Sequence, residues 1–172
     1  MKRLAPALLA LSIFLTGCSN STGLAPSVSQ SGFDGGRVVD IEPHGNSCAS
    51  MICSGLGAQW SSTNPDIVFL KIKIFNEYKG ITGAKLNIDG KIYDLKPANQ
   101  ANSFNADGGV MATTEMVFIT TPDVVRKITL SKRTWLRVIT TTGTIEDPVI
   151  DGSQDSKAYY ALQRFVAEMD KK

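Results

Sequence analysis

The sequence predicts an α+β fold, with a mainly antiparallel sheet, a short helix near residues 122–130 and a C-terminal amphipathic helix packed on the sheet. Three observations lead to this prediction. Apolar residues and lysines alternate along residues 67–75, as in a strand with one buried face. The dipeptide Asp89-Gly90 separates two further alternating runs and is the strongest short signal for a β-hairpin. Both helical patterns come late in the chain, after runs of strands, which favours the α+β class.

The first residues are typical of a signal peptide. Lys2 and Arg3 precede an apolar run, residues 4–15, which is too short to span a membrane, because a spanning helix needs about 20 apolar residues. The run ends in Leu-Thr-Gly-Cys18, which resembles the lipobox of bacterial lipoproteins. In that family the small residues admit the peptidase and the cysteine thiol takes up a diacylglycerol. The resemblance implies that residues 1–17 are cleaved and that Cys18 is the lipid anchor, and an ordinary signal peptide with a chance cysteine is the alternative.

The lipobox resemblance also implies a location. Bacterial lipoproteins of this kind carry two or three acyl chains, palmitate among them, and stable anchoring takes more than one chain. Ser19 follows the cysteine, whereas Asp at this position often marks retention in the inner membrane of Gram-negative bacteria. For a Gram-negative source we therefore expect a protein that is lipid-anchored in the outer membrane and faces the periplasm.

Small and polar residues, mostly Ser and Gly, dominate residues 18–36 without periodicity, so they predict a flexible tether after the lipidated cysteine. Residues 37–172 are long enough to build one core and predict a single globular α+β domain. The chain has 18 Lys and Arg against 16 Asp and Glu, and loss of Lys2 and Arg3 with the signal peptide makes the two counts equal. A neutral domain argues against nucleic acid as a partner, because binding to phosphates requires an excess of basic residues.

Short apolar and β-branched runs, separated by turn residues, predict the strands of the domain. The run before Pro43 alternates only loosely and suits the edge of a sheet, whereas residues 115–120 are apolar at nearly every position, as in a central strand covered on both sides. The two-residue hairpin turn pairs Leu86 with Tyr93. Residues 98–109 are rich in Asn, Ala and Gly and predict a long loop. The predicted strands are residues 37–42, 56–62, 67–75, 85–88, 91–95, 115–120 and 134–142.

Two amphipathic patterns predict the helices. Thr121 can cap a short helix that begins at Pro122, since proline suits the first helical position. Asp155 or Ser156 can cap the C-terminal helix. The apolar residues of that helix recur at steps of three and four and therefore share one face. They are Tyr159, Leu162, Phe165, Val166 and Met169.

Cys48 and Cys53 remain beside the lipidated cysteine, and an even pair in an oxidising compartment predicts a structural disulfide. Closing so short a loop stabilises the fold by roughly 2 kcal/mol in the chain-entropy model. Two alternatives use the same residues. His44 could join both cysteines on zinc, but the spacing His-x3-Cys-x4-Cys matches no strong zinc pattern, and a redox pair is typically Cys-x-x-Cys. We therefore expect no metal and no cofactor.

Signals for catalysis are weak. His44 is the only histidine, and its place between Pro43 and Gly45 predicts a surface loop residue rather than a general base. The chain has no Gly-x-Ser-x-Gly elbow, phosphate loop, dinucleotide fingerprint or His-Glu-x-x-His motif. A run of acidic residues could form a glycosidase pair only with a raised pKa, and its polar, exposed setting gives no reason for one. These residues are Glu146, Asp147, Asp151 and Asp155. The sequence therefore does not predict an enzyme.

Two further features suit binding. Basic residues cluster before the acidic run, and they predict either a solvated surface or a patch for an anionic partner such as lipid headgroups or a glycan. Trp60 and Trp135 predict core packing, or a platform for a sugar or peptide if both face the same exposed surface. The basic residues are Arg126, Lys127, Lys132, Arg133 and Arg137.

These observations predict a non-catalytic, lipid-anchored envelope lipoprotein that acts by binding or scaffolding, with membrane contact through Cys18 and an envelope protein as candidate partner. The alternative is an inhibitor of a hydrolase, or a periplasmic ligand carrier, that uses the disulfide loop of residues 44–55. The run Trp-Leu-Arg-Val at 135–138, with the apolar pattern of 158–165, resembles uncharacterised small envelope proteins and implies no activity. The sequence leaves the partner, the orientation and the oligomeric state open.

Overall fold

All strands of the described chain join in one antiparallel sheet. The computed structural model describes residues 24–107 and 111–171. The strand order is β1-β2-β3-β4-β8-β6-β5-β9-β10-β11, and β7 pairs with β8 beside this path. The strands are β1 (Ser27–Gln30), β2 (Arg37–Gly45), β3 (Cys53–Ser61), β4 (Val68–Phe75), β5 (Ile81–Ile88), β6 (Lys91–Pro97), β7 (Ser103–Asp107), β8 (Met111–Thr120), β9 (Arg133–Thr140), β10 (Gly143–Asp151) and β11 (Gln154–Asp155).

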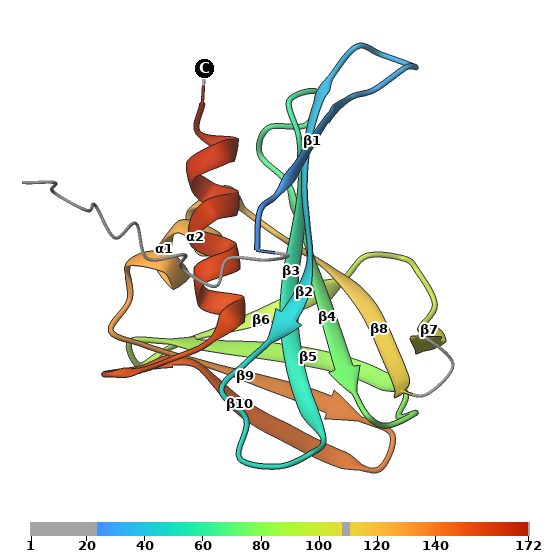
Figure 1. Cartoon of the computed structure of the whole chain (residues 1–172), viewed down its shortest axis with the longest axis vertical. Coiled ribbons are helices and arrows are strands. Elements are labelled where there is room, and N and C mark those ends of the chain that lie inside the picture. Colours follow the sequence, from blue (N-terminus) through green and yellow to red (C-terminus); the bar gives the residue numbers. More distant parts are fainter. Residues whose placement is uncertain (1–23, 108–110, 172) are drawn as a thin grey trace, which may run out of the picture.

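The sheet has two halves that share β6. In Figure 1, β2, β3 and β4 of the first half run along the long axis, and β5, β9 and β10 of the second half cross below them. Most of β6 pairs with β5, whereas its last residues, Lys96 and Pro97, pair with Ile119 and Phe118 of β8. A single strand thus carries the hydrogen-bond ladder from one half into the other.

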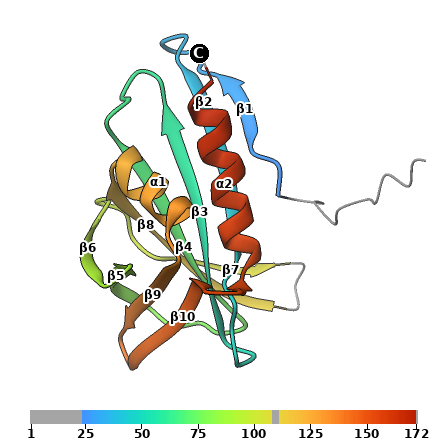
Figure 2. The same cartoon turned by 90° about the vertical axis from the view of Figure 1, so that its left-hand side faces the viewer.

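Two helices complete the fold, α1 (Pro122–Leu130) and α2 (Lys157–Met169), which confirms a mainly antiparallel sheet with a short helix at 122–130 and a C-terminal helix. The Ser156 hydroxyl caps α2 by accepting a hydrogen bond from Tyr159 N at 3.1 Å. Figure 2 shows α2 alongside β2 and β3, and residues of α2 contact both strands and α1. The Arg37 guanidinium donates hydrogen bonds of 2.8 Å to the backbone oxygen and carboxylate of Glu168. Among the described residues, no helix is long and apolar enough to cross a membrane.

The patterns with the clearest alternation are confirmed. Leu70, Ile72 and Ile74 of β4 are fully buried, as one face of a half-buried strand requires. Asp89 and Gly90 both have positive φ, 47° and 90°, as a tight two-residue hairpin turn needs. The predicted pairing of Leu86 with Tyr93 is also present.

The folded domain begins earlier than the predicted boundary at residue 37. Strand β1 lies within the predicted tether and pairs with β2, and Leu24 is only 6% exposed in the core. All four side chains of β1 are exposed, so backbone pairing with β2 holds the strand, together with a hydrogen bond from the Ser27 hydroxyl to the Asp40 oxygen, and no apolar alternation reveals it. Residues 1–23, with the predicted signal peptide and Cys18, lie outside the described residues.

The predicted edge strand at 37–42 is longer and lies inside the sheet. Strand β2 runs through Pro43 to Gly45, and β1 and β3 pair with its two sides. The register between β2 and β3 shifts between Ile41 and His44, and proline is tolerated at such a bulge because the ladder is interrupted there. A Cβ at Gly57 would lie 2.5 Å from the Ile41 oxygen, so this close approach requires glycine.

Three predictions about the later chain are wrong. The predicted loop at 98–109 contains β7, which pairs with β8. The predicted central strand at 115–120 is covered on one side only, since Phe118 is buried and Ile119 is 38% exposed. The predicted exposed setting of the acidic run is also wrong, since most of the run lies in β10, which pairs with β9, and Asp147 is only 6% exposed. Pairing across the sheet, rather than local composition, decides each of these cases.

Candidate functional site

The predicted disulfide is present and closes the connection between β2 and β3. Cys48 and Cys53 are bonded, with Cα atoms 5.5 Å apart. Strand β2 ends at Gly45 and β3 begins at Cys53, so the bond lies at the base of a short loop, residues 46–52. We call this segment the disulfide loop.

Hydrogen bonds fix the disulfide loop to distant parts of the domain. Ser47 N donates to the Pro148 oxygen of β10 at 2.9 Å, and Gln154 Nε2 donates to Ser47 Oγ at 2.7 Å. On the other side, Asn76 Nδ2 donates to the Met51 oxygen at 2.6 Å. These bonds join the loop to three separate segments, so its backbone conformation is set by the fold and not only by the disulfide.

Met51 is a large apolar side chain that this loop exposes. It is 84% exposed, whereas the neighbouring Ile52 packs partly against the core. A long, unbranched thioether adapts its shape to an apolar cavity, because it has three rotatable bonds. The loop therefore presents one adaptable apolar group on a fixed backbone.

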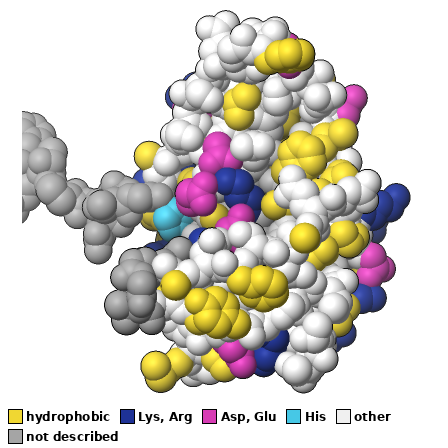
Figure 3. Space-filling model, turned by 90° about the vertical axis from the view of Figure 1, so that its right-hand side faces the viewer, with side chains coloured by type: hydrophobic (Ala, Val, Ile, Leu, Met, Phe, Trp, Pro, Cys, Tyr) yellow, Lys and Arg dark blue, Asp and Glu magenta, His cyan; other side chains and the backbone are white. Residues whose placement is uncertain are grey.

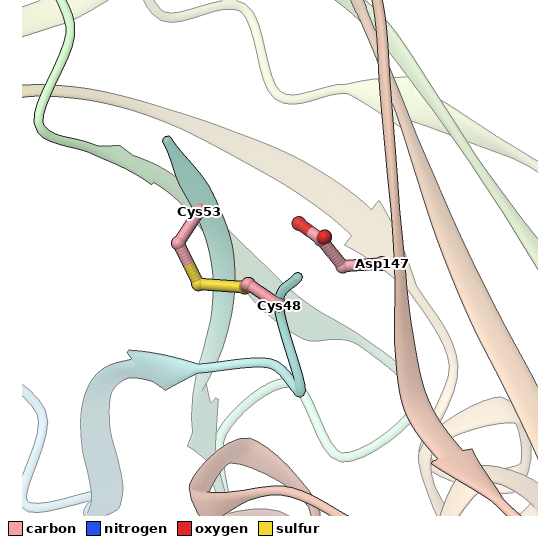
Figure 4. Close-up of side chains that lie close together, drawn as sticks. All are labelled: Cys48, Cys53 and Asp147. Atoms are coloured by element: carbon pink, nitrogen blue, oxygen red, sulfur yellow. A yellow bond between two sulfur atoms is a disulfide. The ribbon is translucent and has the colours of Figure 1, made fainter. Parts of the chain in front are cut away.

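A buried carboxylate lies beside the disulfide, as Figure 4 shows. Asp147 of β10 is 6% exposed, and its Oδ2 accepts hydrogen bonds from Ser54 N at 2.8 Å and Ser54 Oγ at 2.6 Å. These bonds connect β10 with β3, which are far apart in the strand order of the sheet. The sequence predicts an exposed polar segment around Asp147, and no local signal distinguishes this residue from its acidic neighbours.

The structure does not group His44 with the two cysteines, as the zinc alternative required, but places Asp147 beside them. The ligand atoms of Cys48, Cys53 and Asp147 lie within 4.8 Å of one another, and His44 is not in this group. His44 belongs to β2 opposite Leu56 and is half-buried, not part of a surface loop. As half-cystines the two sulfurs carry no negative charge, so they are not the thiolate ligands that zinc prefers. The nearby carboxylate disfavours thiolates, which favours the bonded state.

A second candidate site lies on the other half of the sheet. A groove of about 510 Å3 crosses the outer face of β5, β6, β9 and β10. Trp135 lines it, and its indole Nε1 donates to Asp151 Oδ2 at 2.8 Å. The Arg133 guanidinium lies 5.7 Å from the centre of the Trp135 ring. The further lining residues are Lys85, Leu86, Asn87, Ile92, Leu136, Arg137 and Glu146.

The two tryptophans do not form a common platform. Trp60 of β3 lies opposite the buried Val39 and Val68 and packs against the core, with its Nε1 donating to the Pro65 oxygen at 3.0 Å. Trp135 alone belongs to the groove. Core packing is thus the role of Trp60, and the two-tryptophan platform is wrong.

The basic and acidic runs partly neutralise each other, as one alternative predicted. Arg137 pairs with Glu146 at 2.7 Å, and Arg133 pairs with Asp151 at 3.3 Å, in both cases across β9 and β10. Arg126 pairs instead with Asp170 after α2, at 2.7 Å. Because three basic residues of the cluster point to three different partners, they do not build one uniform positive patch.

A third group of charges lies on the first half of the sheet, on the side away from the buried residues of β4. Lys71 Nζ is 2.8 Å from Asp40 Oδ1 and 2.9 Å from Glu42 Oε1. Burial disfavours the ammonium, but its hydrogen bonds to Asp40 and Glu42 outweigh this and raise the pKa of Lys71. The hydrogen bond from Lys71 lowers the pKa of Glu42. Figure 3 shows charged side chains at the centre of one face of the molecule, with apolar side chains above and below.

Comparisons with models of known protein families, with curated proteins and with solved structures find no match to this chain.

Proposed function

We propose that this chain is a non-catalytic, lipid-anchored lipoprotein of the bacterial envelope that acts by binding a protein partner. In this proposal Cys18 carries the lipid in the outer membrane and the domain faces the periplasm. The observation that supports binding is the disulfide loop, which exposes Met51 on a backbone fixed at both sides. A loop that is already ordered loses little conformational entropy when a partner closes over it.

The position of Leu24 supports an arrangement close to the membrane. Residues 19–23 separate the proposed anchor from this buried residue. A fully extended chain between the two residues reaches at most about 20 Å. A domain held within this distance meets partners of the same membrane first. We further propose that α2 packs on the sheet through its contacts with β2 and β3, so that the disulfide loop and the groove stay accessible.

The same loop also supports a second candidate function, inhibition of a hydrolase. An exposed side chain on a rigid loop suits insertion into the substrate cleft of a hydrolase. Because such a loop is preorganised, it binds at little entropic cost and does not adapt to the geometry that cleavage requires. A periplasmic ligand carrier is the third reading, and the groove at Trp135 is the feature that favours it.

Crosslinking in living cells tests the proposed function. A photoreactive residue replaces Met51, and a matched variant carries it at Phe33, which is 101% exposed in the β1–β2 loop. We expect position 51 to capture a discrete envelope protein, identified by mass spectrometry, and position 33 not to capture it. Identical products from both positions would contradict the proposal.

The identity of the captured protein separates the first two candidates. A hydrolase whose activity falls on addition of this protein, and recovers with the Met51→Ser variant, would establish inhibition. A captured protein without hydrolytic activity would support binding or scaffolding.

A further inference from the structure

The groove contains two like charges in direct opposition. Lys85 of β5 and Arg137 of β9 are register partners, and their outer neighbours in the same row are Asp94 of β6 and Glu146 of β10. The row therefore reads negative, positive, positive, negative across four strands. Like charges directly opposite each other destabilise a sheet, whereas an alternating row would not. Local rules of this kind are often broken at functional sites, so the pair of Lys85 and Arg137 marks the groove as a candidate binding site.

The acidic neighbours hold the two cations only loosely. Lys85 pairs with Asp94 at 2.7 Å, and Arg137 pairs with Glu146 at 2.7 Å, but the side chains of Asp94 and Glu146 are 72% and 44% exposed. Exposed ion pairs are weak because water and salt screen them. An anion that enters between Lys85 and Arg137 can therefore compete with these carboxylates.

The next row of the sheet supplies an apolar surface beside the cations. It contains Ile92, Asn87 and Trp135 on β6, β5 and β9, and Ile92 is 54% exposed. The bond to Asp151 and the Arg133 guanidinium hold the indole of Trp135 in place. A fixed indole next to two cations suits a ligand that has an apolar ring face and an anionic substituent.

We infer that this groove binds an anionic saccharide, with the carboxylate of an acidic sugar between Lys85 and Arg137 and the C–H face of a sugar ring against Trp135. The volume of about 510 Å3 lies in the range of small-ligand sites, roughly 300 to 1,000 Å3. The amide of Asn87 and the carboxylate of Glu146 also line the groove and can form hydrogen bonds with sugar hydroxyls. This site goes beyond the proposed binding of a protein partner, since it uses none of the disulfide loop, and it gives the groove a ligand class.

The two indole N–H resonances test the inference within one molecule. The protein, purified from cells that express the whole chain and labelled with 15N, is titrated with trigalacturonic acid and separately with neutral galactotriose. We expect the Trp135 indole signal to shift with the acidic sugar, and the shift to shrink as salt is added. The Trp60 indole signal lies outside the groove and should stay in place, which also reports that the fold is intact.

Three variants locate the site. Arg137→Gln and Lys85→Gln should each weaken binding of trigalacturonic acid about tenfold, which corresponds to about 1.4 kcal/mol. Lys132→Gln removes the same charge next to the groove but outside its lining, and it should leave the affinity unchanged. Equal weakening by all three variants would show a general charge effect and overturn the inference.

Two further outcomes would also overturn it. Neutral galactotriose that binds as well as the acidic sugar would remove the role of the cation pair. Vesicles of phosphatidylglycerol that shift the Trp135 signal, when trigalacturonic acid does not, would identify a lipid headgroup in place of a saccharide. Failure of this site leaves the crosslinking result at Met51 untouched, so the two proposals are tested separately.

Discussion

The two loops at the ends of β2 resemble each other in exposure and differ in support. The β1–β2 loop exposes Phe33, and the disulfide loop exposes Met51. The hydrogen bonds of the first loop are mostly internal, such as Ser31 N to the Gly36 oxygen at 2.7 Å, and its Asp34 also bonds to Thr63 in the neighbouring β3–β4 turn. The second is joined to β10 and to Asn76 and is closed by the disulfide. Exposure of an apolar side chain is thus a poor sign of function by itself, and attachment to the rest of the fold separates the two loops.

The largest effect on the contrast between the two loops is expected from removal of the Asp147 carboxylate, which is buried beside the disulfide. Asp147→Ala leaves the N–H and hydroxyl of Ser54 without their acceptor, which we expect to lower the free energy of unfolding by about 3 kcal/mol. Urea unfolding followed by circular dichroism measures the change. Asp94→Ala removes an exposed carboxylate as the control and should cost little. An equal loss in both variants would contradict the role of Asp147.

Removal of the disulfide should have the next largest effect. Cys48→Ala combined with Cys53→Ala should lower the free energy of unfolding by about 2 kcal/mol, because the unfolded chain gains conformational freedom. Phe33→Ser in the other loop should leave the urea midpoint unchanged. If the double variant unfolds at the same urea concentration as the original protein, the hydrogen bonds alone fix the loop.

A smaller effect should appear in the chemistry of the disulfide. Asp147→Asn removes a negative charge within 4.8 Å of both sulfurs and keeps an acceptor for Ser54. We expect reduction by dithiothreitol to become about fivefold faster, because the thiolates that form are no longer repelled. Thiol titration during the reaction gives the rate. An unchanged rate would mean that the charge of Asp147 does not reach the sulfurs.

The smallest effect concerns the middle of β2, between the two loops. The pKa of Glu42 is lowered by its hydrogen bond from Lys71, so the pair stabilises the fold above the ordinary value of 4.5 and loses this contribution as the pH falls below it. Glu42→Gln should flatten the acid limb of the stability profile by a few tenths of a kcal/mol. Urea midpoints measured from neutral to acidic pH test this, and a parallel profile of the variant would speak against the pair.

The sequence predicts those elements whose own residues form a clear local pattern. Strand β4 alternates along its whole length, the hairpin has Asp89-Gly90, and Ser156 precedes the apolar stripe of α2. The disulfide follows from cysteine count and spacing. In each case the deciding residues are close in sequence, and local physical chemistry is enough.

The remaining features depend on residues that are distant in sequence. Strand β1 forms because its backbone pairs with the backbone of β2. Asp147 can be buried because Ser54, 93 positions earlier, donates two hydrogen bonds to it. Lys85 and Arg137 lie opposite each other because of the register between β5 and β9, and the amino-acid composition does not determine that register. Of the candidate site at the disulfide loop, the sequence predicts the two bonded cysteines. Of the groove, it singles out Trp135, the basic residues Arg133 and Arg137, and Glu146, but not that they share one surface.

The shared strand β6 has a mechanical consequence. Since its first part belongs to one half of the sheet and its last two residues to the other, neither half can peel away without breaking backbone bonds of the same strand. A force applied at the N-terminal end of the domain and resisted at the disulfide loop acts within the first half, along β1, β2 and β3. The hydrogen bond from Ser47 to Pro148 passes part of this load into β10, so a pull on the N-terminal end of the domain reaches the groove first through the strand that carries Glu146.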